Sequence, residues 1–196
     1  HLYIRFVAVG NTSTSGFDGN ICSDGGALTG FNASVLIGDF NSADALTAQA
    51  NIDLNSAYAS LMALTNTVAH LAIFGAGETI FPGVYNIASA GSLGGTITLD
   101  GQNDPDAIFV FKFGGAFSVA AASKIILTNG TRRCNVFWIG GAGVATGAIT
   151  IGAASVLKGT FLSYGGACNT GGGVFLAGRQ LSTAGAVNTY SGVVYN

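Results

Sequence analysis

The chain has 196 residues, of which 49 % are hydrophobic, 31 are Gly and only 8 % are charged. Its formal net charge of -2 argues against a nucleic-acid partner and against anionic membranes, because both select clustered Lys and Arg. No hydrophobic run approaches the length that spans a bilayer. We expect a single domain over residues 1–196, which is long enough to bury a substantial core.

The N-terminal part reads as short strands that are separated by Gly, Asn and Asp. Residues 1–7 carry no visible cleavable signal, which we interpret as a signal already removed or a start that is not native. The following strands fit one or two coils of a β-solenoid, and we place them at residues 12–15, 17–22, 27–31 and 34–37.

Residues 42–64 predict one long helix, with Ser42 or Asn41 as its N-cap. The segment is rich in Ala and has no Gly or Pro. A helix of about 23 residues spans roughly 35 Å, whereas six coils at about 4.8 Å each occupy roughly 29 Å. We therefore expect the helix to lie along the whole stack. Its hydrophobic residues form one stripe of Leu46, Ala50, Leu54, Ala57, Tyr58, Leu61 and Met62.

Two kinds of strand follow the helix. Residues 107–113 and 135–139 are nearly continuous hydrophobic runs, which indicate burial on both faces. We expect the helix stripe to pack on them. Residues 117–120 and 149–152 alternate instead, so that Ser118 and Thr150 point outward from a wall that no other segment covers.

The last 38 residues are two copies of one unit, residues 159–177 and 178–196, with nine of nineteen positions identical. A period of 19 residues is too short for a pair of helices and fits one coil of a β-solenoid. Strand alternation then points Cys168 inward and Asn169 outward, with Asn188 outward in the second copy.

The residues with catalytic or metal-binding chemistry are few. Cys22, Cys134 and Cys168 have no metal-ligand spacing, and a disulfide between two of them remains an open alternative. Asp100, Asp104 and Asp106 have the spacing of oxygen ligands for Ca²⁺, but Asp-Gly and Asp-Pro pairs favour turns. His70, just after the helix, has no partner in the sequence that would make a catalytic set, and we interpret it as a capping or surface residue.

Three segments then carry a resemblance to a known family. They are residues 81–87 (FPGVYNI), 93–112 (LGGTITLDGQNDPDAIFVFK) and 134–138 (CNVFW). With them, the chain from about Asn11 to Asn196 resembles the microbial ice-binding (antifreeze) proteins. The resemblance implies a mostly β fold, a triangular and discontinuous right-handed parallel β-solenoid with one long α-helix along one face. It also implies that N-terminal and C-terminal coils interleave.

In that family the ice-binding surface is usually the uncovered face, whose strands carry outward pairs such as Thr-x-Thr or Thr-x-Asn. The lack of a catalytic or metal-ligand set leads us to expect no enzyme activity, no cofactor and no metal. The resemblance implies the ice surface as the partner, and with it a secreted protein, which we expect to be a monomer. Carried over to this chain, the ice-binding residues would be Thr12, Thr29, Ser118, Ala120, Thr150, Gly152, Asn169, Gly171, Asn188 and Tyr190, with Gly10 beside them.

Two rival functions are weighed against ice binding. Polysaccharide-cleaving solenoids need paired carboxylates or a base with bound calcium, and the sequence offers no second acid, base or nucleophile beside the Asp cluster. The stronger alternative is an extracellular carbohydrate-binding or adhesin-type module. Such a module would use exposed aromatic side chains, and Tyr164, Tyr190 and Tyr195 are candidates in the C-terminal coils.

Overall fold

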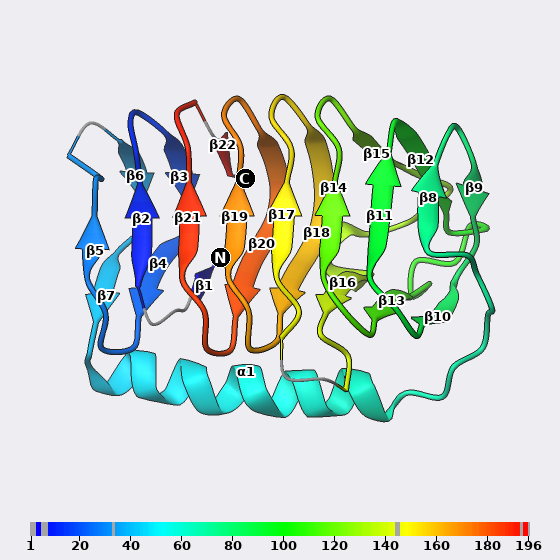
Figure 1. Cartoon of the computed structure of the whole chain (residues 1–196), viewed down its shortest axis with the longest axis horizontal. Coiled ribbons are helices and arrows are strands. Elements are labelled where there is room, and N and C mark those ends of the chain that lie inside the picture. Colours follow the sequence, from blue (N-terminus) through cyan, green and yellow to red (C-terminus); the bar gives the residue numbers. More distant parts are fainter. Residues whose placement is uncertain (1–2, 5–7, 33, 144–145, 193, 196) are drawn as a thin grey trace.

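The computed structural model describes residues 3–4, 8–32, 34–143, 146–192 and 194–195, which form a parallel β-solenoid with one α-helix along its side (Figure 1). The predicted mostly β fold with a long flanking helix is therefore confirmed. Neighbouring coils of the C-terminal repeat align with an offset of 19 residues, as in the pairs Cys168↔Val187 and Asn169↔Asn188. The repeat unit seen in the sequence is thus one coil.

One side of the solenoid is an eight-stranded sheet that faces the viewer in Figure 1. Each of its strands is only two to four residues long, because corners follow closely on both sides. In spatial order the strands are β5 (Leu28–Thr29), β2 (Val9–Asn11), β21 (Val187–Thr189), β19 (Cys168–Thr170), β17 (Ile149–Ile151), β14 (Phe117–Val119), β11 (Gly91–Gly94) and β8 (Ile73–Gly75).

The other two sides are formed by an eleven-stranded sheet that bends around a corner and by a three-stranded sheet. The larger sheet runs through β10 (Gly83–Ile87), β13 (Phe109–Phe113), β16 (Val136–Gly140), β18 (Val156–Ser163), β20 (Phe175–Ser182), β22 (Val194–Tyr195), β3 (Gly16–Asp18) and β6 (Val35–Ile37), with β9 (Thr79–Ile80), β12 (Thr96–Asp100) and β15 (Lys124–Thr128) branching from it. The smaller sheet contains β1 (Tyr3–Ile4), β4 (Asn20–Ser23) and β7 (Phe40–Ser42). A 3-10 turn, η1 (Arg133–Asn135), precedes β16.

The order of coils in space differs from their order in the sequence. The C-terminal coil pairs with the first N-terminal coil, since Val187 to Thr189 align with Val9 to Asn11. The chain then continues through a second N-terminal coil into the helix, which runs back along the stack, and the segment after the helix reaches the opposite end (Figure 1). Eight strands are stacked where six coils were expected, so at about 4.8 Å per coil the stack occupies about 38 Å and the helix does not lie along all of it. The helix of 19 residues spans only about 28 Å.

The core is a stack of aromatic and aliphatic side chains inside the coils. The rings of Phe111 and Trp138 are stacked at 4.0 Å, Phe161 follows Trp138 on the next coil at 6.0 Å, and Phe117 from the eight-stranded sheet stacks beside Trp138 at 5.5 Å. All four side chains have no exposed surface. Successive coils therefore repeat the same inward position with large rings, which fixes the register between them.

The helix, α1 (Ala45–Ala63), begins later than the sequence predicted. Asn41 and Ser42 belong to β7, and Ala43 takes a positive φ of 51°, so neither of them can cap the helix. Asp44 is the N-cap: its carboxylate accepts from Thr47 N at 2.8 Å, and Thr47 Oγ1 accepts from Asp44 N at 2.9 Å. This reciprocal pair satisfies two backbone donors at the helix start.

The helix packs as predicted on the strands that are buried on both faces. Leu54 is buried among Val84, Val110, Ile139 and Leu162, with other stripe residues beside it. The predicted stripe is wrong at its N-terminal part, however. Leu46 is 69 % exposed, and it lines, with Ala50 and Ala57, a groove of about 550 Å³ between the helix and β4 and β20.

A buried lysine holds the C-terminal end of the helix. Lys112 on β13 is only 2 % exposed, and its Nζ donates to the carbonyl oxygens of Met62 at 3.1 Å and Leu64 at 2.6 Å and to Asn66 Oδ1. A cation at this position satisfies carbonyl groups that no intrahelical donor reaches and opposes the negative end of the helix dipole. Burial lowers the pKa of Lys112.

Candidate functional site: the exposed eight-stranded sheet

Two sides of the solenoid are not covered by the helix, and they differ in charge and relief. The side built on β12 and β15 presents Lys124, Lys158 and Asp18, and Ile126 is 44 % exposed on it. The outward positions of the eight-stranded sheet carry no charged side chain among the described residues. Of these two sides, as far as the structure describes them, the eight-stranded sheet is the uncharged one.

The predicted outward residues form one polar row along this sheet. On every strand except the two end strands, β5 and β8, the residues before and after the outward one are buried, as Phe117 and Val119 are around Ser118. Parallel pairing then aligns the outward residues across the stack in the order Ile73, Ser92, Ser118, Thr150, Asn169, Asn188, Gly10 and Thr29. The amide of Asn188 also donates to Asn169 Oδ1 at 2.8 Å, which links two rungs by their side chains.

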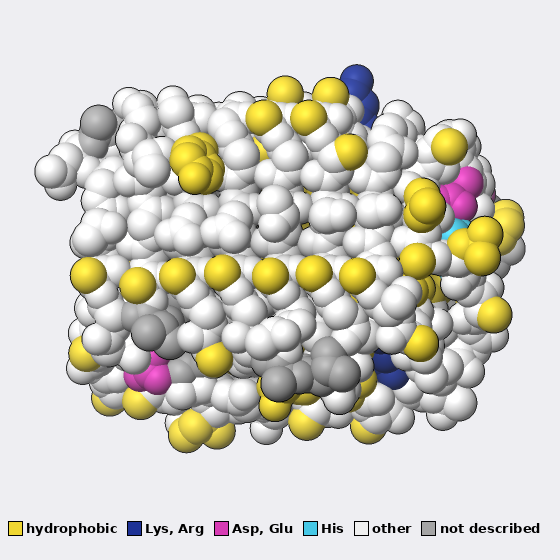
Figure 2. Space-filling view, in the orientation of Figure 1, with side chains coloured by type: hydrophobic (Ala, Val, Ile, Leu, Met, Phe, Trp, Pro, Cys, Tyr) yellow, Lys and Arg dark blue, Asp and Glu magenta, His cyan; other side chains and the backbone are white. Residues whose placement is uncertain are grey.

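A second row consists of alanine, and the sequence patterns above did not predict it. Each of its members directly precedes the first inward residue of a strand. For all of them except Ala90, the carbonyl accepts from a backbone amide of the next rung, as Ala167 O does from Ile149 N at 2.9 Å. We call this the alanine row, and in stacking order it contains Ala27, Ala8, Ala186, Ala167, Ala148, Ala116 and Ala90. Figure 2 shows an evenly spaced line of hydrophobic side chains crossing this face.

A signal for the alanine row was present in the sequence. The pattern Ala, then an inward residue, then an outward Ser, Thr, Asn or Gly recurs in all seven of these strands, for example in Ala148 to Thr150 and Ala186 to Asn188. The alanines lie at strand ends, where small residues are also typical of corners, and this hid their outward direction.

A third row lies on the other side of the polar row and contains the remaining predicted residues. Backbone hydrogen bonds from Ala120, Gly152, Gly171, Tyr190 and Thr12 to the preceding rung continue the ladder. Thr12 and Ala120 are exposed, whereas the ring of Tyr190 stands out at 52 % exposure among small neighbours.

Gly152 and Gly171 are tightly packed positions within this third row. A Cβ on Gly152 would lie 2.4 Å from Ala121 N, and one on Gly171 would lie 2.7 Å from Ala153 N. Both glycines therefore allow the turn of one rung to approach the backbone of the next. They contribute backbone surface to the face and have no room for a side chain.

Hydroxyl groups inside the corners hold the rungs at fixed separation. Ser163 Oγ donates within 2.8 Å of the carbonyl oxygens of Gly147 and Gly166. Ser182 Oγ reaches Gly166 O at 2.8 Å, and Ser155 Oγ lies within 3.1 Å of Ala120 O and Gly152 O. These buried bonds join successive coils at the edges of the exposed sheet, so the spacing of its rows is set by a rigid frame.

The acidic cluster forms turns, as the sequence favoured. Asp100 Oδ1 accepts from Gln102 N at 2.8 Å and from Asn129 Nδ2, and Asp104 Oδ1 accepts from Asp106 N at 2.9 Å. These are side-chain-to-backbone bonds of the Asx-turn type. Within the described ranges, no group of three or more His, Cys, Asp and Glu side chains is placed to hold a metal ion.

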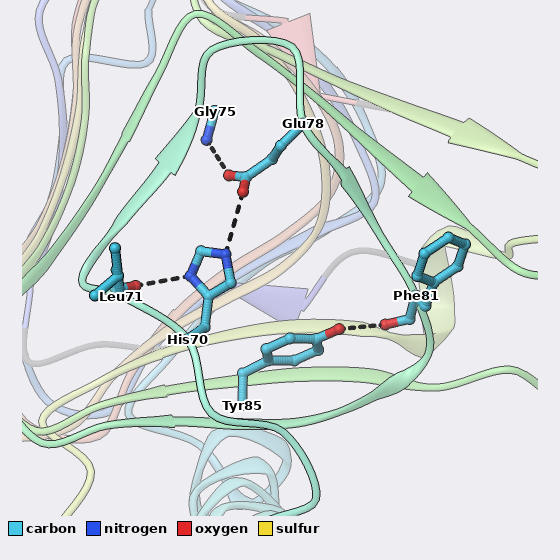
Figure 3. A network of polar contacts seen from close by, with 6 residues as sticks. All are labelled: His70, Leu71, Gly75, Glu78, Phe81 and Tyr85. Carbon is cyan, nitrogen blue, oxygen red and sulfur yellow. Dashed lines mark hydrogen bonds and ion pairs between the residues drawn. The ribbon is translucent and has the colours of Figure 1, made fainter.

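His70 belongs to a polar network that closes the β8 end of the core (Figure 3). Its Nε2 lies 3.1 Å from Glu78 Oε2 and its Nδ1 lies 2.8 Å from Leu71 O, while the other oxygen of Glu78 accepts from Gly75 N. The imidazole stacks on the ring of Phe74 at 4.0 Å. His70 thus covers the end of the aromatic column.

The three cysteines are free thiols. Cys134 is exposed, and Cys22 is buried and accepts a weak bond from Asn41 Nδ2. Cys168 is the predicted buried rung residue: Gln180 Nε2 donates to its Sγ at 3.0 Å, and burial raises its pKa to about 12. A thiol in this state is not a nucleophile at neutral pH.

Of the three tyrosines considered for sugar stacking, Tyr164 is already engaged. Its ring stacks on Tyr58 of the helix at 4.3 Å with an interplanar angle of 6°. The expectation that Tyr164 is available to a ligand is therefore wrong. Tyr190 is exposed, and the side chain of Tyr195 lies outside the described part of the structure. The described helix does not combine the length and the apolar character that crossing a bilayer requires.

Curated proteins with similar sequences are ice-binding proteins. An ice-binding protein of Nostoc sp. (strain HG1) is 33 % identical over 141 residues, which are 72 % of this chain and 50 % of that protein. Ice-binding protein 1 of Shewanella frigidimarina (strain NCIMB 400) is 44 % identical over 62 residues, which are 31 % of this chain and 7 % of that protein. The chain thus spans half or less of the curated relatives it matches.

Solved structures match over nearly the whole chain. The crystal structure of an ice-binding protein from an Antarctic Flavobacteriaceae bacterium has a TM-score of 0.91 at 34 % identity and covers 100 % of this chain and 45 % of that one. The protein from the Antarctic ascomycete Antarctomyces psychrotrophicus has a TM-score of 0.84 at 30 % identity, with 98 % and 91 % covered. The model of the family described as ice-binding-like matches residues 6–194. This chain therefore belongs to the ice-binding-like family.

Proposed function

We propose that this domain adsorbs to ice through its exposed eight-stranded sheet and thereby inhibits ice growth and recrystallisation. The observation that carries the proposal is the alignment of the alanine row and the polar row on one flat, uncharged sheet. Membership in the ice-binding-like family supports it.

Recognition of ice requires regular spacing, because ice presents a lattice of water molecules without charge. Neighbouring rungs repeat at about 4.8 Å across the strands, and outward residues along a strand repeat at roughly 6.6 Å. Both repeats are fixed by backbone geometry. The two rows therefore offer a two-dimensional array of methyl, hydroxyl and amide groups.

These small groups suit adsorption through ordered water. Hydroxyl and amide groups bind waters through hydrogen bonds, and such water-mediated contacts are nearly as favourable as direct ones. The methyl groups of the alanine row offer no hydrogen bonds, so the waters above them are held only at the neighbouring polar groups. The rigid frame of the solenoid limits the entropy that is lost on adsorption. Ice can then grow only in the gaps between adsorbed protein molecules. The ice front becomes curved in these gaps, and this curvature inhibits further growth. No covalent chemistry is involved.

We further propose that the protein acts outside the cell and as a monomer. Ice forms outside cells, and a flat adsorbing surface needs no second subunit to complete it. Both the extracellular location and the monomeric state are thus argued from the nature of the ligand, ice.

The test is a nanolitre freezing assay on a single ice crystal held just below its melting point. We expect faceting of the crystal and a gap between its melting and freezing temperatures. A round crystal that grows freely at micromolar protein would contradict the proposal and leave a shared scaffold without the activity.

A further inference from the structure

The two ends of the solenoid are finished differently. At the β8–β10 end, the amides of Thr67 and Val68 donate to Val84 O at 3.0 and 3.2 Å, and Val68 forms a parallel bridge with Tyr85. His70 covers Phe74, which is only 1 % exposed. The segment after the helix thus closes this end of the core.

The opposite end has no comparable cover among the described residues. β5, β6 and β7 are the last strands of their sheets, and beyond them no described strand pairs. Ile37 is 67 % exposed and Phe40 is 47 % exposed, and the Phe40 ring meets Phe31 edge-on at 5.2 Å. An open strand edge beside exposed hydrophobic side chains is a template for pairing with another chain.

The charge of this end has a single sign. Residues 8–44 contain four Asp and no Lys or Arg. Asp18 is aligned with Ile37 across β3 and β6, and Asp39 lies between Ile37 and Phe40 at the next corner. Both carboxylates are exposed. This end therefore combines the edges of β6 and β7, which no other described strand pairs, with two large exposed hydrophobic side chains, Ile37 and Phe40, and two exposed carboxylates.

We propose that this end docks an extended polypeptide segment that alternates basic and hydrophobic residues. Such a segment adds a strand along β6, places its hydrophobic side chains inward on Leu36 and Phe40, and places its cations on the outward face beside Ile37, against Asp18 and Asp39. A second copy of this chain fits less well, because joining two such ends brings their carboxylates together. The proposal is independent of ice adsorption, since the end strands lie at the edge of the ice-facing sheet.

The test measures binding of a fluorescently labelled Lys-Val-Lys-Val-Lys-Val peptide by anisotropy, with amide chemical shifts read over residues 34–40. A Glu-Val-Glu-Val-Glu-Val peptide is the control for charge. We expect only the basic peptide to bind, with an affinity that falls as the salt concentration rises. We expect the affinity to fall at least tenfold in Ile37→Lys and in Asp39→Lys. Ile73→Lys, at an equally exposed position of the opposite end, is the matched control and keeps full affinity.

Two results would overturn the inference. One is equal binding of the basic peptide to Ile37→Lys and to the unchanged protein, or shifts that map elsewhere. The other is a dimer of the free protein by light scattering that Ile37→Lys dissociates, which would identify a second copy as the occupant. Because Ile37→Lys leaves the alanine and polar rows untouched, its freezing assay separates failure of this inference from failure of ice binding.

Discussion

Asn188 and Asn169 are joined by a side-chain hydrogen bond of 2.8 Å between neighbouring rungs of the exposed sheet. The bond fixes the orientation of both amides, which are aligned by backbone pairing as well. Two outward groups that would rotate freely on an ordinary surface are therefore held in place. Adsorption to ice then has less side-chain freedom to remove.

Bulky substitutions in the polar row form the first prediction. We expect Thr150→Tyr and Asn188→Tyr to fold normally, because both side chains point outward, and to lose most of the thermal hysteresis, because a ring lifts the flat face from the ice. The measurement is a freezing assay with circular dichroism as the check on folding. Thr98→Tyr on the β12 side is the matched control. If Thr98→Tyr abolished the thermal hysteresis while Thr150→Tyr and Asn188→Tyr kept it, the ice-binding face would be the β12 side.

The alanine row gives the second prediction. In Ala167→Leu we expect a strong loss of thermal hysteresis with unchanged thermal unfolding, because the longer side chain projects between Ala148 and Ala186. Ala59→Leu, at an exposed position of the helix, is the control for a surface leucine. Equal activity of the two variants would limit the binding surface to the polar row.

Tyr190 distinguishes ice binding from sugar binding. We expect Tyr190→Thr to have thermal hysteresis at least as large as the unchanged protein, since the third row becomes flatter. A carbohydrate-binding module would instead lose glycan retention with this change. A glycan array on both proteins, beside the freezing assay, provides the comparison, and lost hysteresis would make Tyr190 a contact to ice.

The fourth prediction concerns stability. Lys112→Met leaves the carbonyl groups of Met62 and Leu64 without their donor, and we expect the free energy of unfolding to fall by about 1–3 kcal/mol in urea titrations. An unchanged value would mean that water replaces the ammonium group. Lys158→Met, whose side chain is half-buried and lies over the Phe175 ring on the β12 side, is the matched control.

Lys112 also gives a pH dependence with a definite sign. Its folded pKa is lowered by burial, so the folded chain binds fewer protons than the unfolded chain just below the unfolded pKa of about 10.4. Its contribution to stability is therefore most favourable above that pKa and declines as pH falls through the folded pKa. Burial raises the pKa values of Tyr58 and Tyr85, which act in the opposite direction at high pH. The difference between Lys112→Met and the unchanged protein isolates the lysine.

Local patterns predicted what depends on neighbours along the chain. The alternation around Ser118 and Thr150 predicted their outward direction. The hydrophobic run at residues 107–113 predicted burial on both faces, which holds for Phe109–Phe113 but is wrong for Ile108, whose side chain is 39 % exposed. The register of the 19-residue coils followed from their repeat.

Features that depend on the packing of distant segments were predicted less well. Leu46 fits the hydrophobic stripe by spacing, yet its side chain is largely exposed and lines the groove between the helix and the sheets. Asn41 and Ser42 pair with Cys22 and Ser23 of β4, so the two residues predicted to cap the helix belong to a strand instead. The pairing of the C-terminal coil with the N-terminal coil carries no local signal, and only the family resemblance indicated interleaved coils.

That pairing has a consequence for how the protein is made. Thr189 Oγ1 donates to Asn11 Oδ1, a bond between groups 178 residues apart, so a growing chain synthesises its first two coils long before their neighbour exists. Contacts of such long range form late and slow the folding of β proteins. Until the last coil has been synthesised, the pair of N-terminal coils has an unpaired strand edge on each of its two sides. Such edges can pair with other nascent chains, and the cell must prevent this.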